Sequence, residues 1–160
     1  MNLVPAQTVG NIETARVLFR EYQRFLGVDL CFQDFAEELA TLPGRYAPPR
    51  GRLLLAMAGA NAAGCVALRP LEGGVCEMKR LFVRPAWRSQ GLGERLARQI
   101  IADATALGYT VMRLDTLDTL ESAMRLYTAL GFQRCAPYYS NPLPGVVYWE
   151  RMLNPPDVRP

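Results

Sequence analysis

Two glycines, Gly91 and Gly93, mark the segment of this sequence that is best suited to chemistry. They follow Arg88 at the end of an apolar stretch, and they begin a stripe of apolar residues with helical spacing. Amide groups at a helix start have no partner within the helix, and the helix dipole adds roughly half a positive charge there. Glycine lets the backbone approach an anion closely, and arginine can add a charge-assisted hydrogen bond. We therefore predict a phosphate-binding turn at residues 88–93.

Two other phosphate-binding motifs do not fit this turn. A P-loop needs Gly-Lys followed by Ser or Thr, which the sequence lacks. A dinucleotide-binding fingerprint needs a third glycine where Leu96 stands. A bare Gly-x-Gly also occurs in simple strand-to-helix turns, so the surrounding residues have to decide between these interpretations.

The surrounding pattern resembles the acetyl-coenzyme A-binding motif of the GNAT superfamily of N-acetyltransferases. It consists of a strand, Arg-x-x-Gly-x-Gly, a helix, a strand and a second helix. That second helix leads into residues 123–132, Ala-Met-Arg-Leu-Tyr-Thr-Ala-Leu-Gly-Phe, which are similar to the superfamily's Ala-x-x-Leu-Tyr-x-x-x-Gly-Phe segment. The resemblance covers residues 51–152 well and the first fifty residues loosely. Many relatives carry Asn seven residues before the tyrosine, where this sequence has Leu120.

The resemblance implies an acetyl-coenzyme A-dependent N-acetyltransferase. Such an enzyme passes the acetyl group directly to a primary amine of a small molecule or peptide in a ternary complex. The cofactor's pyrophosphate would lie on the glycine turn, and its pantetheine arm would pair with the preceding strand as an added strand does. The cofactor-binding residues implied are Leu81, Phe82, Val83, Arg88, Ser89, Gln90, Gly91, Leu92, Gly93 and Glu94.

The same resemblance suggests two catalytic residues. Tyr127 would be the general acid, because a phenol with a pKa of about 10 is protonated at neutral pH and can donate a proton to the departing thiolate. Histidine is absent, so the base must be a carboxylate, a tyrosine, a cysteine, an amine or water. Glu77 stands eleven residues before Arg88, where histone-acetylating relatives place a catalytic glutamate. Asp115 and water remain alternatives for the base, and no metal is expected.

The acceptor is expected opposite the cofactor, over the N-terminal helices and the last hairpin. Acidic and aromatic residues in these segments would suit a cationic amine with an apolar body. Surface charge and a packed Tyr-Tyr corner explain the same residues equally well. The candidates are Asp29, Phe32, Glu37, Asp115, Tyr138, Tyr139 and Asn141.

Periodicity predicts the elements that must position these residues. The fold class expected from their order and from the resemblance is α+β, a GNAT-like mixed sheet of six or seven largely antiparallel strands flanked by about four helices. The sheet would splay between the strands at 75–83 and 109–115. Helices are predicted at 11–26, 33–41, 92–107 and 119–130. Strands are predicted at 52–59, 61–69, 75–83, 109–115, 132–138 and 146–152.

The turn at 71–74 sets the register of the hairpin around it. If all four residues form the turn, Pro70 faces Val75. Cys76 then faces Arg69 rather than Cys65, so no disulfide is expected there. The four cysteines are scattered in apolar segments without metal-ligand spacing and are predicted to be buried, reduced thiols: Cys31, Cys65, Cys76 and Cys135.

Composition narrows the remaining function classes. The 160 residues, half of them apolar, predict a single GNAT domain over 1–160. No apolar run approaches the ~20 residues that span a bilayer, and the N-terminus lacks a signal-peptide pattern, so we expect a cytoplasmic protein without membrane contacts. A net charge of +3 with dispersed arginines does not favour nucleic-acid binding. A non-catalytic acyl-coenzyme A-binding module remains the alternative. The sequence leaves open the acceptor's identity, the acyl chain and the oligomeric state, including a homodimer.

Overall fold

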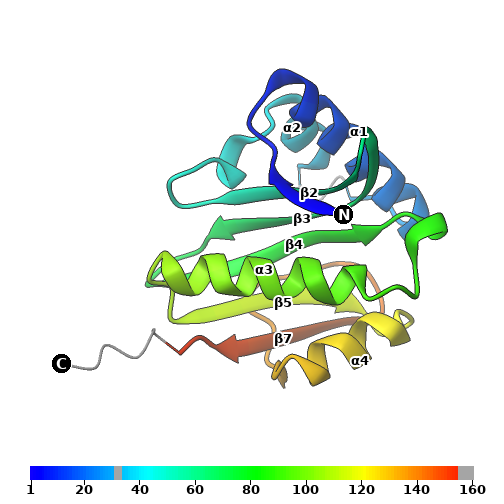
Figure 1. The fold of residues 1–160 in the computed structure, drawn as a ribbon. Helices are drawn as coiled ribbons and strands as arrows, with labels where there is room; N and C mark the ends of the chain where they lie inside the picture. Colours follow the sequence, from blue (N-terminus) through cyan, green and yellow to red (C-terminus); the bar gives the residue numbers. More distant parts are fainter. Residues whose placement is uncertain (31–33, 155–160) are drawn as a thin grey trace.

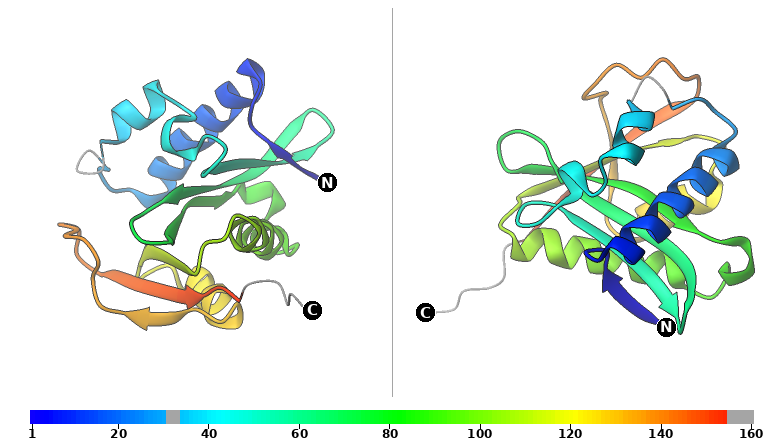
Figure 2. Two further views of the ribbon diagram at one scale, coloured as in Figure 1. Left: turned by 90° about the vertical axis from the view of Figure 1, so that its left-hand side faces the viewer. Right: turned by 90° about the horizontal axis from the view of Figure 1, so that it is seen from above.

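A single seven-stranded sheet organises the chain, and the computed structural model describes residues 1–30 and 34–154. The strand order is β1-β2-β3-β4-β5-β7-β6, and the pairs are antiparallel except for β4 with β5. Helices α1 and α2 lie on one face of the sheet, and α3 and α4 lie on the other (Figures 1 and 2). The predicted fold class is therefore confirmed.

Most element boundaries lie within two residues of those predicted. Strand β1 was not predicted, and β6 is shorter than the predicted 132–138 because the chain leaves the sheet after Cys135. The helices are α1 Val9–Leu26, α2 Phe35–Ala40, α3 Leu92–Ala106 and α4 Glu121–Ala129, with 3-10 helices η2 Gly44–Tyr46 and η3 Pro85–Trp87. The strands are β1 Asn2–Pro5, β2 Arg52–Ala58, β3 Asn61–Pro70, β4 Val75–Val83, β5 Val111–Leu117, β6 Gln133–Cys135 and β7 Val146–Met152.

Two apolar clusters hold the helices to the sheet. The stripe predicted on α3 is buried against the sheet, and Leu96 and Ile100 are fully inaccessible there. On the other face Leu18 and Phe19 of α1 pack into a separate cluster with residues of β2 and β3. Burying a large apolar side chain contributes roughly 1.5–3 kcal/mol, so these stripes fix both helices firmly.

The β3–β4 hairpin is one residue out of the predicted register. The amide of Leu71 donates to the carbonyl of Val75 at 2.8 Å, so the loop is three residues long rather than four. Pro70 therefore faces Cys76, and the neighbouring pair is Arg69 with Glu77. A three-residue hairpin loop typically needs a residue in the left-handed region, and the glycines at the end of this loop supply it.

The cysteine prediction is correct for two residues and wrong for one. Cys65 and Cys76 are buried free thiols. Cys135 is also free, but it is only partly buried because the short strand β6 lies at the edge of the sheet. Cys31 lies outside the described residues.

A bulge in β4 decides which side chains face which layer. Arg80 has a φ of 61°, and the pairing with β3 shifts there by one residue. An extra residue in a strand reverses the alternation of side chains beyond it. Lys79 and Phe82 consequently face the side of α1, whereas Leu81 and Val83 pack toward α3 and α4.

Strands β4 and β5 separate next to this bulge. They pair only from Val75 to Glu77, opposite 111–113. Beyond that point β4 continues along β3, while β5 continues along β7 as far as Leu117. The predicted splay between these two strands is confirmed.

Gly64 allows β3 to approach β4 beside the splay, and this closeness can be tested. A Cβ at this position would lie 2.6 Å from the carbonyl oxygen of Phe82 and 3.3 Å from Leu96 Cδ1. We expect Gly64→Ala to lower the free energy of unfolding by about 1–3 kcal/mol, because packed backbone must move. The control is Gly10→Ala in α1, where a Cβ meets nothing within 4 Å. It should raise stability by up to about 1 kcal/mol through helix propensity. Equilibrium urea denaturation measures both, and equal effects would contradict the close approach.

Candidate active site

A cleft of about 790 Å³ lies where β4 and β5 separate. Its walls come from the end of β4, the turn before α3, the start of α4 and the last turns of α1. The residues proposed from the sequence that line it are Leu81, Val83, Arg88, Ser89, Gly91, Leu92, Gly93, Asp115 and Tyr127. The structure thus brings the predicted turn, the predicted acid and one predicted base to one cavity.

Two helix starts border this cleft, and neither has a side-chain cap. Gly91, with φ 77°, is the N-cap of α3, and its carbonyl accepts from the amide of Arg95 at 3.1 Å. Leu120, in the position where relatives carry Asn, is the N-cap of α4. Uncapped first turns leave amide donors and the positive end of the helix dipole for water or a ligand. This donor set fits the phosphates of coenzyme A.

Arg88 braces the glycine turn as well as lining the cleft. Its Nε donates to the carbonyl of Val83 at 2.9 Å, and its guanidinium lies 4.5 Å from the ring centroid of Phe25. Phe25 was not predicted to belong to the site, because its place on α1 comes next to the turn only in the folded chain. A phosphate contact by Arg88 is left to its terminal amino groups.

Three predicted cofactor residues do not line the cleft. The bulge at Arg80 turns the Phe82 side chain away from it, into the cluster beneath α1. Gln90 and Glu94 are exposed, and Glu94 pairs with Arg98 at 2.9 Å. For the acceptor, Asp29 and Glu37 are exposed away from this cleft, and Phe32 lies outside the described residues.

Tyr127 is held between α4 and the sheet. It is 7% exposed, and its ring packs edge-on against Phe132 at 5.8 Å between centroids. Burial raises the pKa of its hydroxyl, and nearby Tyr22 and Asp115 add to the increase. The phenol is therefore protonated throughout the neutral range.

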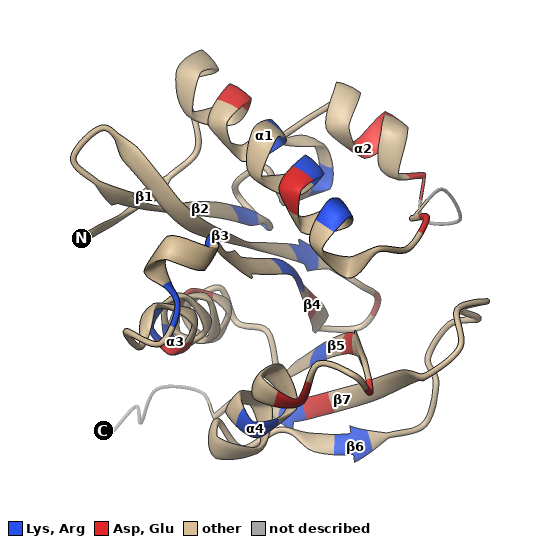
Figure 3. Cartoon of the chain, turned by 90° about the vertical axis from the view of Figure 1, so that its right-hand side faces the viewer, with Lys and Arg blue, Asp and Glu red and all other residues tan. Residues whose placement is uncertain are grey.

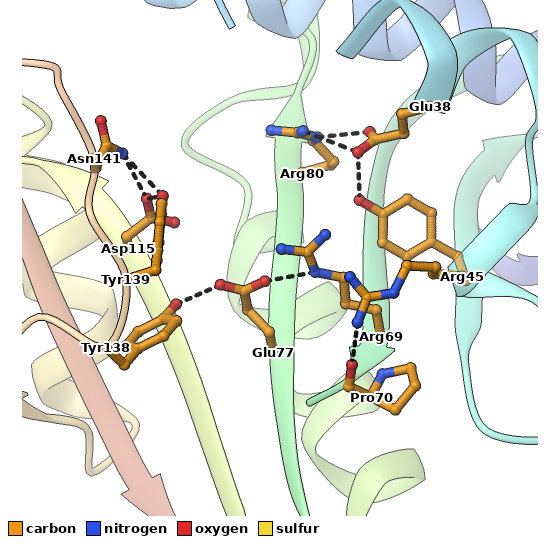
Figure 4. Close-up of polar contacts among 11 residues, drawn as sticks. Glu38, Arg45, Arg69, Pro70, Glu77, Arg80, Asp115, Tyr138, Tyr139 and Asn141 are labelled. Atoms are coloured by element: carbon orange, nitrogen blue, oxygen red, sulfur yellow. Dashed lines mark hydrogen bonds and ion pairs between the residues drawn. The ribbon is translucent and has the colours of Figure 1, made fainter. Parts of the chain in front are cut away.

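Asp115 lines the cleft and is held by hydrogen bonds from the 138–141 loop. Its Oδ2 accepts a short hydrogen bond from Tyr139 and a second one from Asn141 Nδ2 at 3.1 Å. The hydroxyl of Tyr148 donates to the carbonyl of Tyr139 at 3.0 Å. Figure 4 shows the Asp115 contacts, which join the 138–141 loop to β5. The structure thus brings two predicted acceptor residues, Tyr139 and Asn141, into contact with a predicted base.

Glu77 lies deeper and is already fully paired. Its side chain is inaccessible; Oε1 accepts from Arg69 Nε at 2.6 Å, and Oε2 accepts a short hydrogen bond from Tyr138 (Figure 4). The register expected from the sequence placed Arg69 opposite Cys76. The observed register places Arg69 opposite Glu77 instead.

A family model described as the acetyltransferase (GNAT) family matches residues 15–132 of the chain. The chain belongs to the GNAT acetyltransferase family. An uncharacterized N-acetyltransferase of Schizosaccharomyces pombe is 47% identical over 140 residues, which cover 86% of each chain. A GNAT acetyltransferase from Staphylococcus aureus Mu50 has a similar fold, with a TM-score of 0.80 at 20% identity over 96% of this chain and 99% of that one.

A second solved structure with a similar fold was determined with coenzyme A. A Bacillus subtilis acetyltransferase solved in complex with CoA has a TM-score of 0.68 at 18% identity, covering 96% of this chain and 99% of that one. GNAT enzymes use acetyl-coenzyme A, so the recognition made from the two motifs is confirmed. Within residues 1–30 and 34–154, no helix has the length and apolar character needed to cross a membrane.

Lys79 is a buried amine beside this site that the sequence did not suggest as a site residue. It is 6% exposed, and burial lowers its pKa to about 8, with Arg80 adding to the decrease. The folded chain therefore loses this proton near pH 8, whereas the unfolded chain keeps it to about pH 10.5. Only correct strand pairing would have placed this lysine in the interior.

We expect the stability of the protein, measured relative to Lys79→Met, to increase between pH 8 and pH 10.5. The unfolded state binds more protons in this window, so the free energy of unfolding rises with pH, by on the order of 3 kcal/mol in full. Urea denaturation of both proteins at pH 7 and pH 10 measures the difference. A difference that does not change with pH would contradict the burial of this amine.

Proposed function

We propose that the protein transfers an acetyl group from acetyl-coenzyme A directly to a primary amine of a small molecule or peptide in a ternary complex. The observation that carries this proposal is the cleft itself. Two uncapped helix starts border it, and Tyr127 and Asp115 both line it, beside the opening between β4 and β5. One domain over residues 1–160 and a cytoplasmic location stay predictions, and so does a homodimer.

The donors that would hold the cofactor come mainly from the backbone. Amides at the starts of α3 and α4 would bind the pyrophosphate, with Arg88 adding a terminal amino group. The main chain of Leu81 and Val83, beyond the last β4–β5 pair, has the position to bind the pantetheine amides. When bound, acetyl-coenzyme A supplies an acetyl thioester that an amine can attack.

Tyr127 is the general acid in this proposal. Tyr127 lines the cleft, and burial keeps its hydroxyl protonated, so the hydroxyl can donate to the sulfur when the thioester breaks. Its ring is fixed by Phe132 and Trp149, which limits the positions that the hydroxyl can take.

Asp115 is the stronger candidate for the base. It lines the cofactor cleft and also contacts the loop on the acceptor side, so it is within reach of both reactants. Glu77 is inaccessible, and both of its oxygens already accept hydrogen bonds. We propose that Asp115 receives the amine proton, directly or through water, and that Glu77 positions Arg69 and Tyr138.

Tyr127→Phe should lower kcat by about 10²-fold or more, because general acid catalysis typically contributes 10²–10⁴-fold. Coenzyme A binding should change little, since the cofactor contacts are mostly backbone groups. Thiol release under steady-state conditions and calorimetric titration of coenzyme A measure the two quantities. Tyr109→Phe is the matched control, because this buried tyrosine donates to the carbonyl of Arg50 and does not line the cleft. Wild-type turnover in Tyr127→Phe would remove the proposed acid.

The two carboxylates can be separated by the pH dependence of kcat/KM. We expect Asp115→Asn to remove the acidic limb of the profile, because the base is gone. Glu77→Gln should keep that limb and change mainly KM and stability. Loss of the limb in Glu77→Gln, with a normal profile in Asp115→Asn, would return the role to Glu77.

A further inference from the structure

A second cavity, of about 630 Å³, lies against the paired ends of β4 and β5. Three arginines from three elements line it: Arg45 from η2, Arg69 from β3 and Arg113 from β5. We call this space the arginine cavity. Tyr138 and Tyr139 also line it; they belong to the 138–141 loop, which we call the acceptor loop. Glu72 and Glu77 line it as well. It shares no lining residue with the cofactor cleft, and its three arginines were not among the residues that the sequence suggested.

Charged residues form a row across the sheet beneath the arginine cavity. Arg69 faces Glu77, Glu77 faces Arg113, and Arg113 faces Glu150 on β7. Figure 3 shows basic and acidic positions together on β4, β5 and β7. The row is neutral, with ion pairs of 2.6 Å and 3.5 Å, and Arg45 and Glu72 add one charge of each sign to the lining of the cavity.

The arginine cavity offers hydrogen-bond donors more than acceptors. Both oxygens of Glu77 accept hydrogen bonds, one from Arg69 and one from Tyr138. Arg69 donates to Glu77 only from its Nε. Nε of Arg113 is buried and has no hydrogen-bond partner among the described residues; its ion pair with Glu150 is too long and poorly aligned to satisfy it. Arg45 gives Nη2 to the carbonyl of Pro70 at 2.7 Å (Figure 4). The remaining guanidinium N–H groups suit an anion.

The acceptor loop connects this cavity to the transfer site. Tyr139 lines the arginine cavity and donates to Asp115, which lines the cofactor cleft. The rings of Tyr138 and Tyr139 lie 5.4 Å apart and form a continuous aromatic wall. A molecule whose amine lies at Asp115 can therefore extend along this wall toward the arginines.

We infer that the acceptor is an amine that also carries a carboxylate, and that Arg45, Arg69 and Arg113 form the site for this carboxylate. The inference rests on the proposed function and names its substrate class. A planar guanidinium matches a carboxylate through two parallel hydrogen bonds, which lysine cannot form. The cationic amine expected from the sequence would still lie at Asp115, and the carboxylate is the additional group that the arginines would bind.

Pairs of acceptors that differ only in the carboxylate test this inference. Thiol release from acetyl-coenzyme A is measured with leucine, phenylalanine, aspartate and 4-aminobutyrate, and with the carboxamide counterpart of each. We expect at least one acid to exceed its amide in kcat/KM by about tenfold or more, as charge-assisted hydrogen bonds imply. Arg45→Gln should remove most of that preference while changing transfer to the amide by less than about twofold. Arg20→Gln, at an exposed position on α1, should change neither.

Arg113→Gln tests the same site from a different element, strand β5. Thermal melting verifies that each variant is folded. Equal use of acids and amides, or a preference for amides, would overturn the carboxylate site and leave acetyl transfer standing. A preference for acids that survives in both arginine variants would also overturn it. Absence of transfer to every acceptor, with coenzyme A bound, would overturn the proposed function and this inference together.

Discussion

The buried ion pair between Arg80 and Glu38 is the interaction on which the site depends. Arg80 donates from Nε and Nη2 to the two oxygens of Glu38, at 2.9 and 3.1 Å, and Tyr46 donates to the same carboxylate at 3.0 Å. A buried charge persists only when it is paired and hydrogen-bonded, so this pair fixes a strand residue at a φ of 61°. The resulting bulge turns Leu81 and Val83 toward α3, next to the point where β4 leaves β5.

In the proposed function, the splayed sheet separates cofactor binding from acceptor binding. Uncapped starts of α3 and α4 provide backbone donors for a phosphate-bearing cofactor, and the polar row beneath the arginine cavity suits the acceptor. Asp115 belongs to both sides, because it lines the cleft and holds the 138–141 loop. Leu120 at the start of α4 fits this division, since a side chain that does not cap the helix leaves its amides to a ligand.

Local pattern was enough to predict the glycine turn, the α3 stripe and the Tyr127 helix, because each depends on neighbours in sequence. Strand β1 was not predicted, because four residues ending in proline carry little periodicity. The arginine cavity and the partner of Glu77 were not predictable for a different reason. They depend on the β3–β4 register, and a one-residue error in a strand changes every cross-strand partner. Phe82 was misplaced because nothing in the sequence marks the bulge at Arg80.

All of these features bear on one proposed interaction, the binding of coenzyme A by backbone amides at the opening between β4 and β5. Titration of the isotope-labelled protein with coenzyme A, followed through the amide signals in NMR spectra, tests it most directly. The account predicts saturable shifts that are largest at residues 81–83, 91–94 and 120–122. Saturation with the largest shifts elsewhere, or no shifts at millimolar coenzyme A, would contradict it.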